Sequence, residues 1–423
     1  MAMPEQTTEP ISVPKKGKKR IAALCASVLT WTVLAGMLLS ACAAKRELTD
    51  LALVTALGID EKDGKIVVYL QVVNPTGGMQ SGQMGGMSGG SVYTFETTGT
   101  TFVDALAKAD NLVSRQLFYP HLFFIVLGEK FARKRGLDSI VDLLERSNEL
   151  RGTYLFFVAK GTTAGSILKV YTPIEKNPGM ALRDSVMISG SSYGQQVIGV
   201  KDVIRWRYGE NRDPVLHGVE PGTTPEEAKT TKELEHIDAN RDAFRLTGLA
   251  LFRESRLLDW MTLDESLGWT LMSDRYKGSM LLRIPNERQH SSFGILLRNV
   301  RTKLTPELKG EHLSYRVKVK GEAILKEINF DAKVEDERTI QQLQQLTERF
   351  LEEKMLQAVV KAKKHRIDNF GFGDALYRKK PREWEKRKKN WRKDLPALKV
   401  KVSAHIQIMT TGMRSESVHE RKK

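Results

Sequence analysis

Cysteine is nearly absent from this chain of 423 residues: Cys25 and Cys42 are the only two, and both lie near the N-terminus. Two cysteines cannot build the disulfide framework of a small secreted scaffold. A cut just before Cys42 would leave a single cysteine and no internal disulfide. The cysteine count is therefore compatible with a cytosol and with the outside of a bacterial membrane, and it does not fix the compartment.

The common motifs of metal and nucleotide chemistry are also missing. The eight histidines form no H-x-x-H or H-E-x-x-H pair, and there is no C-x-x-C, so the usual zinc patterns are absent. No G-x-G-x-x-G or Walker-type phosphate loop occurs either. We therefore predict that the protein has no metal and no cofactor.

Two short patterns remain as candidates for chemistry. The segment 190–194 fits the G-x-S-x-G pattern of a nucleophile elbow around Ser192. An elbow needs a buried strand before it, and only three apolar residues precede this one, so we interpret Ser192 as part of a polar loop. His121 opens an apolar run, and we interpret it as a structural, hydrogen-bonded histidine rather than a ligand. The sequence thus predicts no catalytic residue and a protein that is not an enzyme.

The overall composition is that of a globular protein, with 41% hydrophobic and 28% charged residues. The length allows two or three domains with their own cores. The formal net charge of +16 favours anionic partners such as nucleic acid, anionic lipid or a wall polymer.

The N-terminus carries the pattern of an exported lipoprotein. Residues 15–20 are basic, residues 21–39 contain no charge, and the run closes with Leu39, Ser40, Ala41 and Cys42. Small residues before a cysteine are what a lipoprotein signal peptidase accepts, so we predict a signal peptide over 1–41 and a lipid on Cys42. The alternative is an uncleaved membrane helix, since about 20 apolar residues can span a bilayer. Both interpretations place the rest of the chain outside the cytoplasm.

Residues 42–208 form an N-terminal region of mixed α and β character, which could comprise two subdomains. The pair Asp63-Gly64 predicts a hairpin, and Thr101 with Asp104 predicts a capping box that opens a helix to about 112. We predict strands over 51–59, 66–73, 121–127 and 153–159, and a second helix over 138–146. The stretch 77–90, rich in Gly, Met and Ser, reads as a flexible loop rather than a soft-metal site.

Residues 209–244 are rich in Gly, Pro, Thr and charge, which is typical of a linker. A C-terminal domain over 245–412 follows, and then a polar tail over 413–423. In this domain we predict strands over 246–252, 257–261, 313–319, 324–330 and 400–408, and a long amphipathic helix over 336–365. The fold class is therefore α+β with two to three mixed domains after the signal peptide.

The region 354–393 is strongly basic, with 15 Lys or Arg against four acids. Its densest cluster is Lys386, Arg387, Lys388 and Lys389, between Trp384 and Trp391. Basic residues with aromatics can follow nucleic acid, but an exported chain would not meet it. Two interpretations stay open: a solvated helix face, or a surface that contacts an anionic surface or a partner protein.

Motifs along nearly the whole chain resemble the Ger(x)C family, the lipoprotein C subunit of spore germinant receptors. No single motif decides this, but together they occur in the family's order and spacing. One departure is Asp259, where the family usually has Gly, and the loop 77–90 looks like an insertion. The matching motifs are 46–54, 56–60, 71–75, His121, 128–129, Ala132, 136–137, Arg146, Arg151, 247–252, 257–260, 368–373, Pro381, Trp384, Trp391 and a closing strand that ends at Gly412.

The resemblance implies a three-domain α+β protein on the outer face of the spore inner membrane. It implies assembly with two integral membrane subunits, of A and B type, in a receptor through which nutrients trigger germination. Whether this subunit touches the nutrient stays open. Two other functions are compatible with an exported, tethered chain: a substrate-binding lipoprotein of a transporter and a wall-acting hydrolase. The first usually has two α/β lobes around a cleft, and the second needs catalytic pairs that are missing here.

Overall fold

The computed structural model describes residues 27–28, 30–32, 50–73, 92–147, 154–170, 177–193, 197–209, 212–222, 244–273, 276, 278–332 and 336–409. The chain divides into two compact units, 1–51 and 52–423. In the first unit, residues 27–28 and 30–32 are helical. Among the described residues, no helix is both long and apolar enough to cross a membrane. The rest of the description concerns the second unit.

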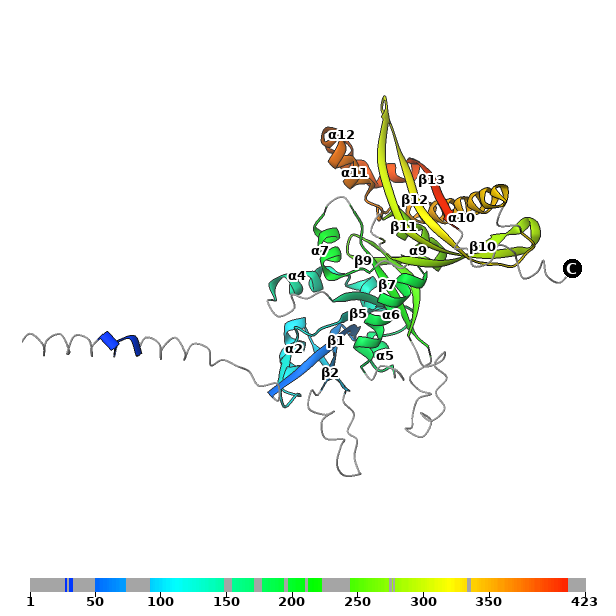
Figure 1. The fold of residues 1–423 in the computed structure, drawn as a ribbon. Helices are drawn as coiled ribbons and strands as arrows, with labels where there is room; N and C mark the ends of the chain where they lie inside the picture. Colours follow the sequence, from blue (N-terminus) through cyan, green and yellow to red (C-terminus); the bar gives the residue numbers. More distant parts are fainter. Residues whose placement is uncertain are drawn as a thin grey trace, which may run out of the picture. The chain divides into compact units, whose positions relative to one another are not determined.

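A mixed nine-stranded sheet forms the first half of this unit (Figure 1). The strand order is β3-β2-β1-β5-β6-β7-β8-β9, and β4 pairs with β1 outside this path. The central strands β1, β5, β6 and β7 are parallel, and the flanking pairs are antiparallel. The strands are β1 (Leu51–Lys62), β2 (Lys65–Val73), β3 (Val92–Gly99), β4 (Gln116–Phe118), β5 (Phe124–Gly128), β6 (Leu155–Ala159), β7 (Val215–Pro221), β8 (Phe244–Arg253) and β9 (Arg256–Trp260).

Helices cover both faces of this sheet. One face packs on α2 (Phe102–Asp110), α3 (Glu129–Lys134), α4 (Asp138–Arg146) and α7 (Val200–Tyr208). The other packs on α5 (Ala164–Leu168) and α6 (Pro178–Tyr193). Every residue of β5 and β6 is buried as a result. This double burial explains why these strands read as unbroken apolar runs in the sequence.

Local signals located several of these elements correctly. Asp63 and Gly64 both have positive φ (52° and 76°) and join β1 to β2, which is the backbone that a two-residue hairpin turn requires. The Thr101 hydroxyl accepts a hydrogen bond from the Asp104 N–H and caps α2. Helix α4 has the predicted bounds. The α+β class is likewise confirmed.

A second sheet has four strands in the order β10-β11-β12-β13. The pairs β10–β11 and β11–β12 are antiparallel, and β12–β13 is parallel. Strands β11 and β12 form a long hairpin that projects from the unit (Figure 1). The strands are β10 (Ser279–Asn286), β11 (Ser291–Lys309), β12 (His312–Ile328) and β13 (Lys399–Met409).

Only one face of this second sheet packs on helices, so its strands alternate between buried and exposed residues. The remaining helical elements are α9 (Leu263–Met272), η3 (Glu287–Gln289), α10 (Glu337–Lys364), α11 (Phe372–Lys379), α12 (Pro381–Arg387), η4 (Lys388–Asn390), α13 (Trp391–Asp394) and η5 (Leu395–Ala397). Asp259, the departure from the family pattern, lies 2.7 Å from Lys361 of α10 and 2.7 Å from His365, the residue that caps this helix, and so links β9 to it.

Helix α10 also closes the edge of the second sheet at β13. Its side chains accept backbone hydrogen bonds at every second residue of the strand: Glu352 from Ala404 N–H, Glu348 from Ile406 N–H and Gln344 from Ile408 N–H, at 2.9–3.0 Å. Residues four apart share a helix face, and strand residues two apart share an edge, so the two spacings match. The helix thereby satisfies donors that an open edge would present to other chains.

Two sequence predictions were wrong. The proposed linker 209–244 contains strand β7, which lies inside the nine-stranded sheet between β6 and β8. A boundary at 245 would separate β7 from β8, its antiparallel neighbour. The two strands predicted over 313–319 and 324–330 are one strand, β12, because pairing with β13 continues through 320–323. The division into two or three domains stays a prediction, and the tail 413–423 lies outside the described residues.

Candidate functional site: a basic pocket beside the Asp213–Arg392 ion pair

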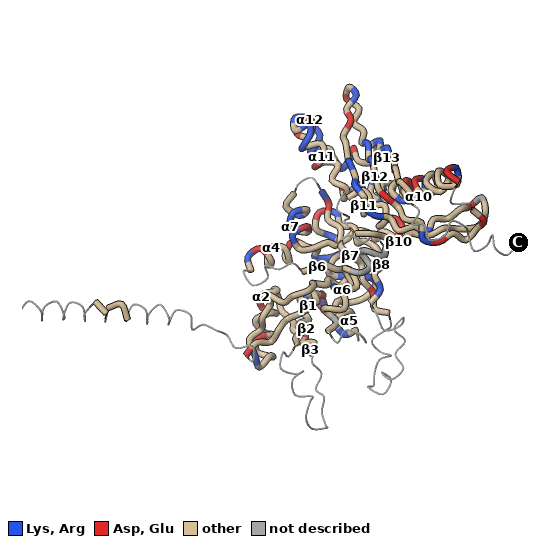
Figure 2. The backbone as a smooth tube through the Cα atoms, viewed as in Figure 1, with Lys and Arg blue, Asp and Glu red and all other residues tan. Residues whose placement is uncertain are grey.

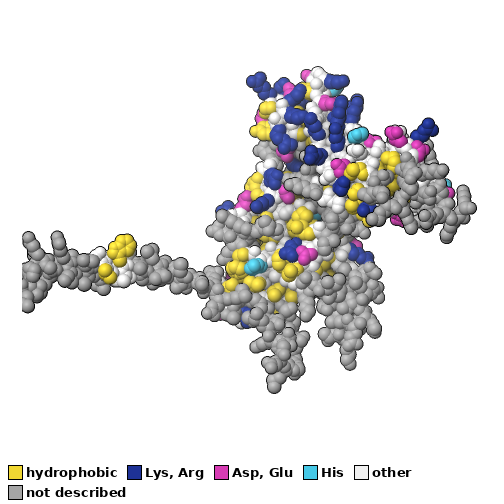
Figure 3. Space-filling model, viewed as in Figure 1, with side chains coloured by type: hydrophobic (Ala, Val, Ile, Leu, Met, Phe, Trp, Pro, Cys, Tyr) yellow, Lys and Arg dark blue, Asp and Glu magenta, His cyan; other side chains and the backbone are white. Residues whose placement is uncertain are grey.

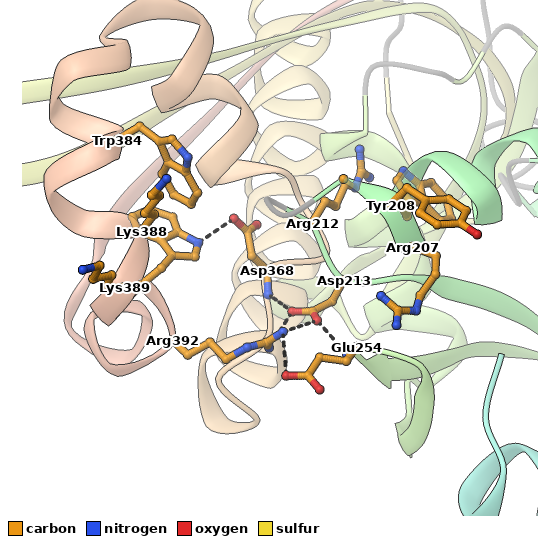
Figure 4. Close-up of a pocket in the computed structure, with 13 residues that line it drawn as sticks. Arg207, Tyr208, Arg212, Asp213, Glu254, Asp368, Trp384, Lys388, Lys389 and Arg392 are labelled. Carbon is orange, nitrogen blue, oxygen red and sulfur yellow. Dashed lines mark hydrogen bonds and ion pairs between the residues drawn. The ribbon is translucent and has the colours of Figure 1, made fainter. Parts of the chain in front are cut away.

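A pocket of about 530 Å³ lies where the C-terminal helices α12 to α13 meet α7 and the start of β7 (Figure 4). It therefore includes the end of the basic cluster predicted from the sequence. Its lining residues are Trp206, Arg207, Tyr208, Gly209, Arg212, Asp213, Glu254, Asp368, Trp384, Lys388, Lys389, Trp391 and Arg392.

Asp368 organises the inner wall of the pocket. Its carboxylate accepts backbone hydrogen bonds from Gly371, Phe372 and Gly373 at 2.7–2.9 Å and a fourth from the Trp391 indole N–H at 3.0 Å. Burial raises the pKa of Asp368 to about 6, although the N–H donors act to lower it. At pH 7 the group is therefore mostly ionised. The motif at 368–373 thus has a structural explanation: the aspartate holds the turn that leads into α11, and Gly371 adopts a positive φ of 78° there.

Asp213 connects this turn to the nine-stranded sheet. Its carboxylate accepts two hydrogen bonds from the Arg392 guanidinium, at 2.9 and 3.0 Å, and others from the backbone N–H groups of Asp368 and Glu254. Asp213 N–H in turn donates to the Asp368 carbonyl at 2.8 Å. Such bidentate, partly buried pairs have fixed geometry. The pair therefore attaches the segment 368–392 to the residues just before β7.

Tryptophans form the apolar part of the pocket wall. Trp384 and Trp391 meet edge to face at 5.2 Å, and Trp206 meets Trp269 in the same way at 6.3 Å. The Arg212 guanidinium lies 4.9 Å from the Trp206 ring centroid. Trp384 and Trp391 are almost fully buried, so they serve as core residues. Their rings are therefore not available to stack on the bases of a nucleic acid, which is how aromatic residues among basic ones would bind it.

The four predicted contact residues differ in their surroundings. Lys386 is exposed and pairs with Glu383, and Lys388 pairs with Glu385 at 2.7 Å. Arg387 donates to the Glu311 carbonyl at 2.7 Å and so ties α12 to the turn between β11 and β12. Lys389 is exposed at the pocket rim and has no ion pair among the described residues. Three of the four are thus surface charges, whereas Arg387 makes a contact that supports the fold.

The lining has no serine, cysteine or histidine that could act as a nucleophile or base. Its two buried carboxylates already accept several hydrogen bonds each. Within the described residues, no three His, Cys, Asp or Glu side chains lie close enough to hold a metal ion. Basic side chains around an apolar wall are suited to non-covalent contact with an anionic partner.

The other sequence candidates lie elsewhere. Cys42 and the loop 77–90 are outside the described residues. Ser192 lies near the C-terminal end of helix α6, so the polar-loop interpretation was wrong for 190–193. An elbow nucleophile sits on a strand-to-helix turn, and this position is not one. His121 is exposed three residues before β5 and packs on the Phe118 ring at 5.7 Å, so it does not open the strand.

Sequence reasoning did not find the Asp213–Arg392 pair. Asp213 fell in the presumed linker, and 178 residues separate it from Arg392. The one signal that pointed to this region was the motif at 368–373, whose aspartate donates its backbone N–H to Asp213 and accepts a hydrogen bond from Trp391, the neighbour of Arg392.

The fold is that of a two-sheet α+β protein, and its pocket is lined by several Lys and Arg side chains. Comparison with known proteins makes the assignment specific. The family model for the spore germination protein N-terminal domain matches residues 44–221, and that for the spore germination B3/GerAC-like C-terminal region matches residues 247–412. The chain belongs to this family of spore germination proteins.

Individual relatives agree. The chain is 32% identical to spore germination protein KC of Bacillus subtilis over 91% of this chain and 96% of the relative. It is 25% identical to the putative spore germination protein YfkR of the same organism over 90% of this chain and 96% of the relative. The crystal structure of the GerBC protein has the same fold, with a TM-score of 0.50 at 17% identity, covering 84% of this chain and 96% of that one.

Proposed function

We propose that this chain is the lipid-anchored C subunit of a spore germinant receptor. In this proposal it is held through Cys42 on the extracytoplasmic face of the spore inner membrane, and it supports germination by assembling with integral membrane subunits of A and B type. The observation that carries the proposal is the full-length similarity to spore germination protein KC. The signal and lipobox at 15–42 supply the route to the membrane.

A lipid anchor allows a weak interface to hold the assembly together. A lipid on Cys42 would confine the chain to the membrane surface, where its concentration relative to membrane-embedded partners is high. Interfaces that would be too weak between free proteins then suffice. A polar contact such as the pocket rim fits this situation better than it would fit a free binding protein.

Within this proposal the exposed lysines at the rim, Lys386, Lys388 and Lys389, contact an acidic surface of a membrane subunit. The Asp213–Arg392 pair holds the helices that present them. The role is non-catalytic: the pocket contributes charge and shape, and its carboxylates are committed to backbone and arginine donors.

The test uses the full-length chain in its own spores. Intact-mass analysis of the membrane-extracted protein should give a chain that begins at a lipidated Cys42, and membrane subunits should co-purify with it after detergent extraction. Cys42→Ala should leave an unprocessed precursor or a released protein. An unmodified Cys42 thiol with residues 1–41 retained would establish the membrane-helix alternative, and failure of any membrane protein to co-purify would contradict the assembly.

A further inference from the structure

The outer face of the four-stranded sheet carries a concentration of positive charge that folding does not require. On three adjacent strands every second residue points away from the helices, and seven of these outward positions hold Lys or Arg. Figures 2 and 3 show Lys and Arg gathered over this part of the molecule. We name these residues the basic sheet face: Arg301 and Lys303 on β11, Arg316, Lys318 and Lys320 on β12, and Lys399 and Lys401 on β13, all exposed.

Strand pairing places like charges directly opposite one another. Arg301 pairs with Lys320 and Lys303 with Lys318 across β11–β12, and Arg316 pairs with Lys401 across β12–β13. Like charges in such positions destabilise a sheet. A surface selected for stability alone would alternate the signs of charge, so this arrangement points to a ligand.

Most of these cations are not neutralised within the part of the chain that the structure describes. Arg316 pairs with Glu307 at 2.9 Å. The other six basic residues of the face have no ion pair among the described residues. Neighbouring outward positions hold the polar residues Thr305, Ser314, Ser403, His405 and Gln407, and the acidic residues Glu307 and Glu322, which pair with Arg316 and Arg298.

The residue types of the basic sheet face indicate which kind of partner it can bind. Stable protein interfaces have an apolar centre and few lysines, and this face has no outward apolar residue at the positions named. Its charges repeat about every 6.8 Å along a strand and about every 4.8 Å between strands, which suits a ligand with repeated negative charges. Five of the seven cations are lysines, which bind phosphate as compact point charges, whereas carboxylates favour the forked guanidinium of arginine.

The position of the face in the unit favours a polymer over a bilayer. On the proposed function, Cys42 holds the chain to the membrane nine residues before Leu51, where β1 begins. Nine residues reach about 32 Å at most. The hairpin of β11 and β12 lies at the opposite end of the unit from β1 and β2 (Figure 1). We propose that the basic sheet face binds a linear, phosphate-bearing polymer that lies beyond the bilayer.

The experiment measures binding of long-chain inorganic polyphosphate to the full-length lipidated protein in nonionic detergent. The variant K318E/K320E should bind about thirtyfold more weakly, because two contacts are lost and two repulsions are added. The slope of log K against log salt should fall by about 1.4, since each phosphate contact on a single strand contributes about 0.7. The matched control K130E/K364E reverses two exposed lysines elsewhere and should bind like the parent protein.

The fold of K318E/K320E should be intact, because the new carboxylates would lie opposite Lys303 and Arg301. A melting temperature at or above that of the parent checks this. Equal weakening in the control would overturn the proposal, as would binding of poly-L-glutamate as tight as that of polyphosphate. Binding to phosphatidylglycerol vesicles without binding to polyphosphate would also overturn it and indicate a lipid surface. None of these outcomes depends on membrane subunits, so the result is separable from the test of the proposed function.

Discussion

The two sheets of this protein differ in how strongly packing constrains their residues. The nine-stranded sheet is buried on both faces at its centre, so nearly every side chain of β5 and β6 is fixed by packing. The four-stranded sheet is buried on one face, and its other face is open and basic. The identity of residues in the first sheet is therefore determined by the packing of the fold. Residues on the outer face of the second sheet are not constrained by packing, so a strong bias towards basic residues there indicates a function.

The largest effect that separates the sheets should come from Phe157 in β6. It is fully buried and packs on the Phe124 ring at 5.6 Å. Phe157→Ala should lower the free energy of unfolding by about 3–5 kcal/mol through lost burial and a cavity. Lys318→Ala, on the basic sheet face, should change it by less than about 0.5 kcal/mol. Urea unfolding of both variants makes the comparison, and similar losses would remove the contrast between the sheets.

A second effect should appear in the pH dependence set by Asp368. Its pKa of about 6 lies above the value of about 3.9 for an aspartate in an unfolded chain. Between about pH 4 and pH 7 the folded state therefore binds more protons than the unfolded state, so the contribution of Asp368 to stability falls as pH rises and is constant above about pH 7. The total change is about 3 kcal/mol at 1.36 kcal/mol per pKa unit.

Asp368→Asn removes this titration. The stability of the parent relative to the variant should therefore fall by about 2 kcal/mol from pH 4 to pH 7 and not change further up to pH 8. Chemical unfolding at several pH values measures the difference, and subtraction cancels the other carboxylates. A difference that stays constant would show that Asp368 titrates at its unfolded value, and one that grows with pH would show that it titrates below that value; either result contradicts the prediction.

A smaller effect should follow from opening the β13 edge. Glu348→Ala/Glu352→Ala removes two acceptors of strand N–H groups and should cost about 2 kcal/mol, at about 1 kcal/mol for each hydrogen bond. The uncovered edge should also favour pairing between copies. Light scattering over a concentration series detects this association. Glu353→Ala, an exposed glutamate on the same helix, is the control and should leave the protein monodisperse.

The smallest change in stability should come from the pocket rim. Reversing Lys386, Lys388 and Lys389 to Glu, with Arg387 kept, should alter the free energy of unfolding by less than about 1 kcal/mol, because exposed ion pairs contribute little. Association with membrane subunits should nevertheless weaken, most clearly at low ionic strength. Reversal of Lys62, Lys130 and Lys364 controls for net charge. If both variants associate like the parent, the rim lysines are a solvated helix face.

Sequence reasoning located elements with strong local signals and missed those fixed by distant partners. Helix α10 was predicted within a residue at each end because Asp336 caps it and its apolar residues repeat at helical spacing. Strand β7 was missed because a short segment among prolines shows its nature only when β6 and β8 flank it. The alternation over 400–408 was recognised, but the basic sheet face needed the lateral register of three strands, which no local pattern contains.

In the candidate site, too, some features could be predicted from the sequence and others could not. The basic cluster at 386–389 was visible from composition, yet the distinct position of Arg387 depends on its contact with the turn at Glu311. The aspartate of the 368–373 motif was noticed as part of a resemblance. Its physical role became clear only from the four donors that surround its carboxylate.

The most direct test of the proposed function is germination itself. Spores that lack the gene should fail to respond to the nutrient that acts through the same operon, while responding normally to agents that bypass the receptors. The intact gene and Ser192→Ala should both restore the response, and Cys42→Ala should not. A full response from the Cys42→Ala chain, or loss of response with Ser192→Ala in a folded and correctly localised protein, would contradict a tethered, non-catalytic receptor subunit.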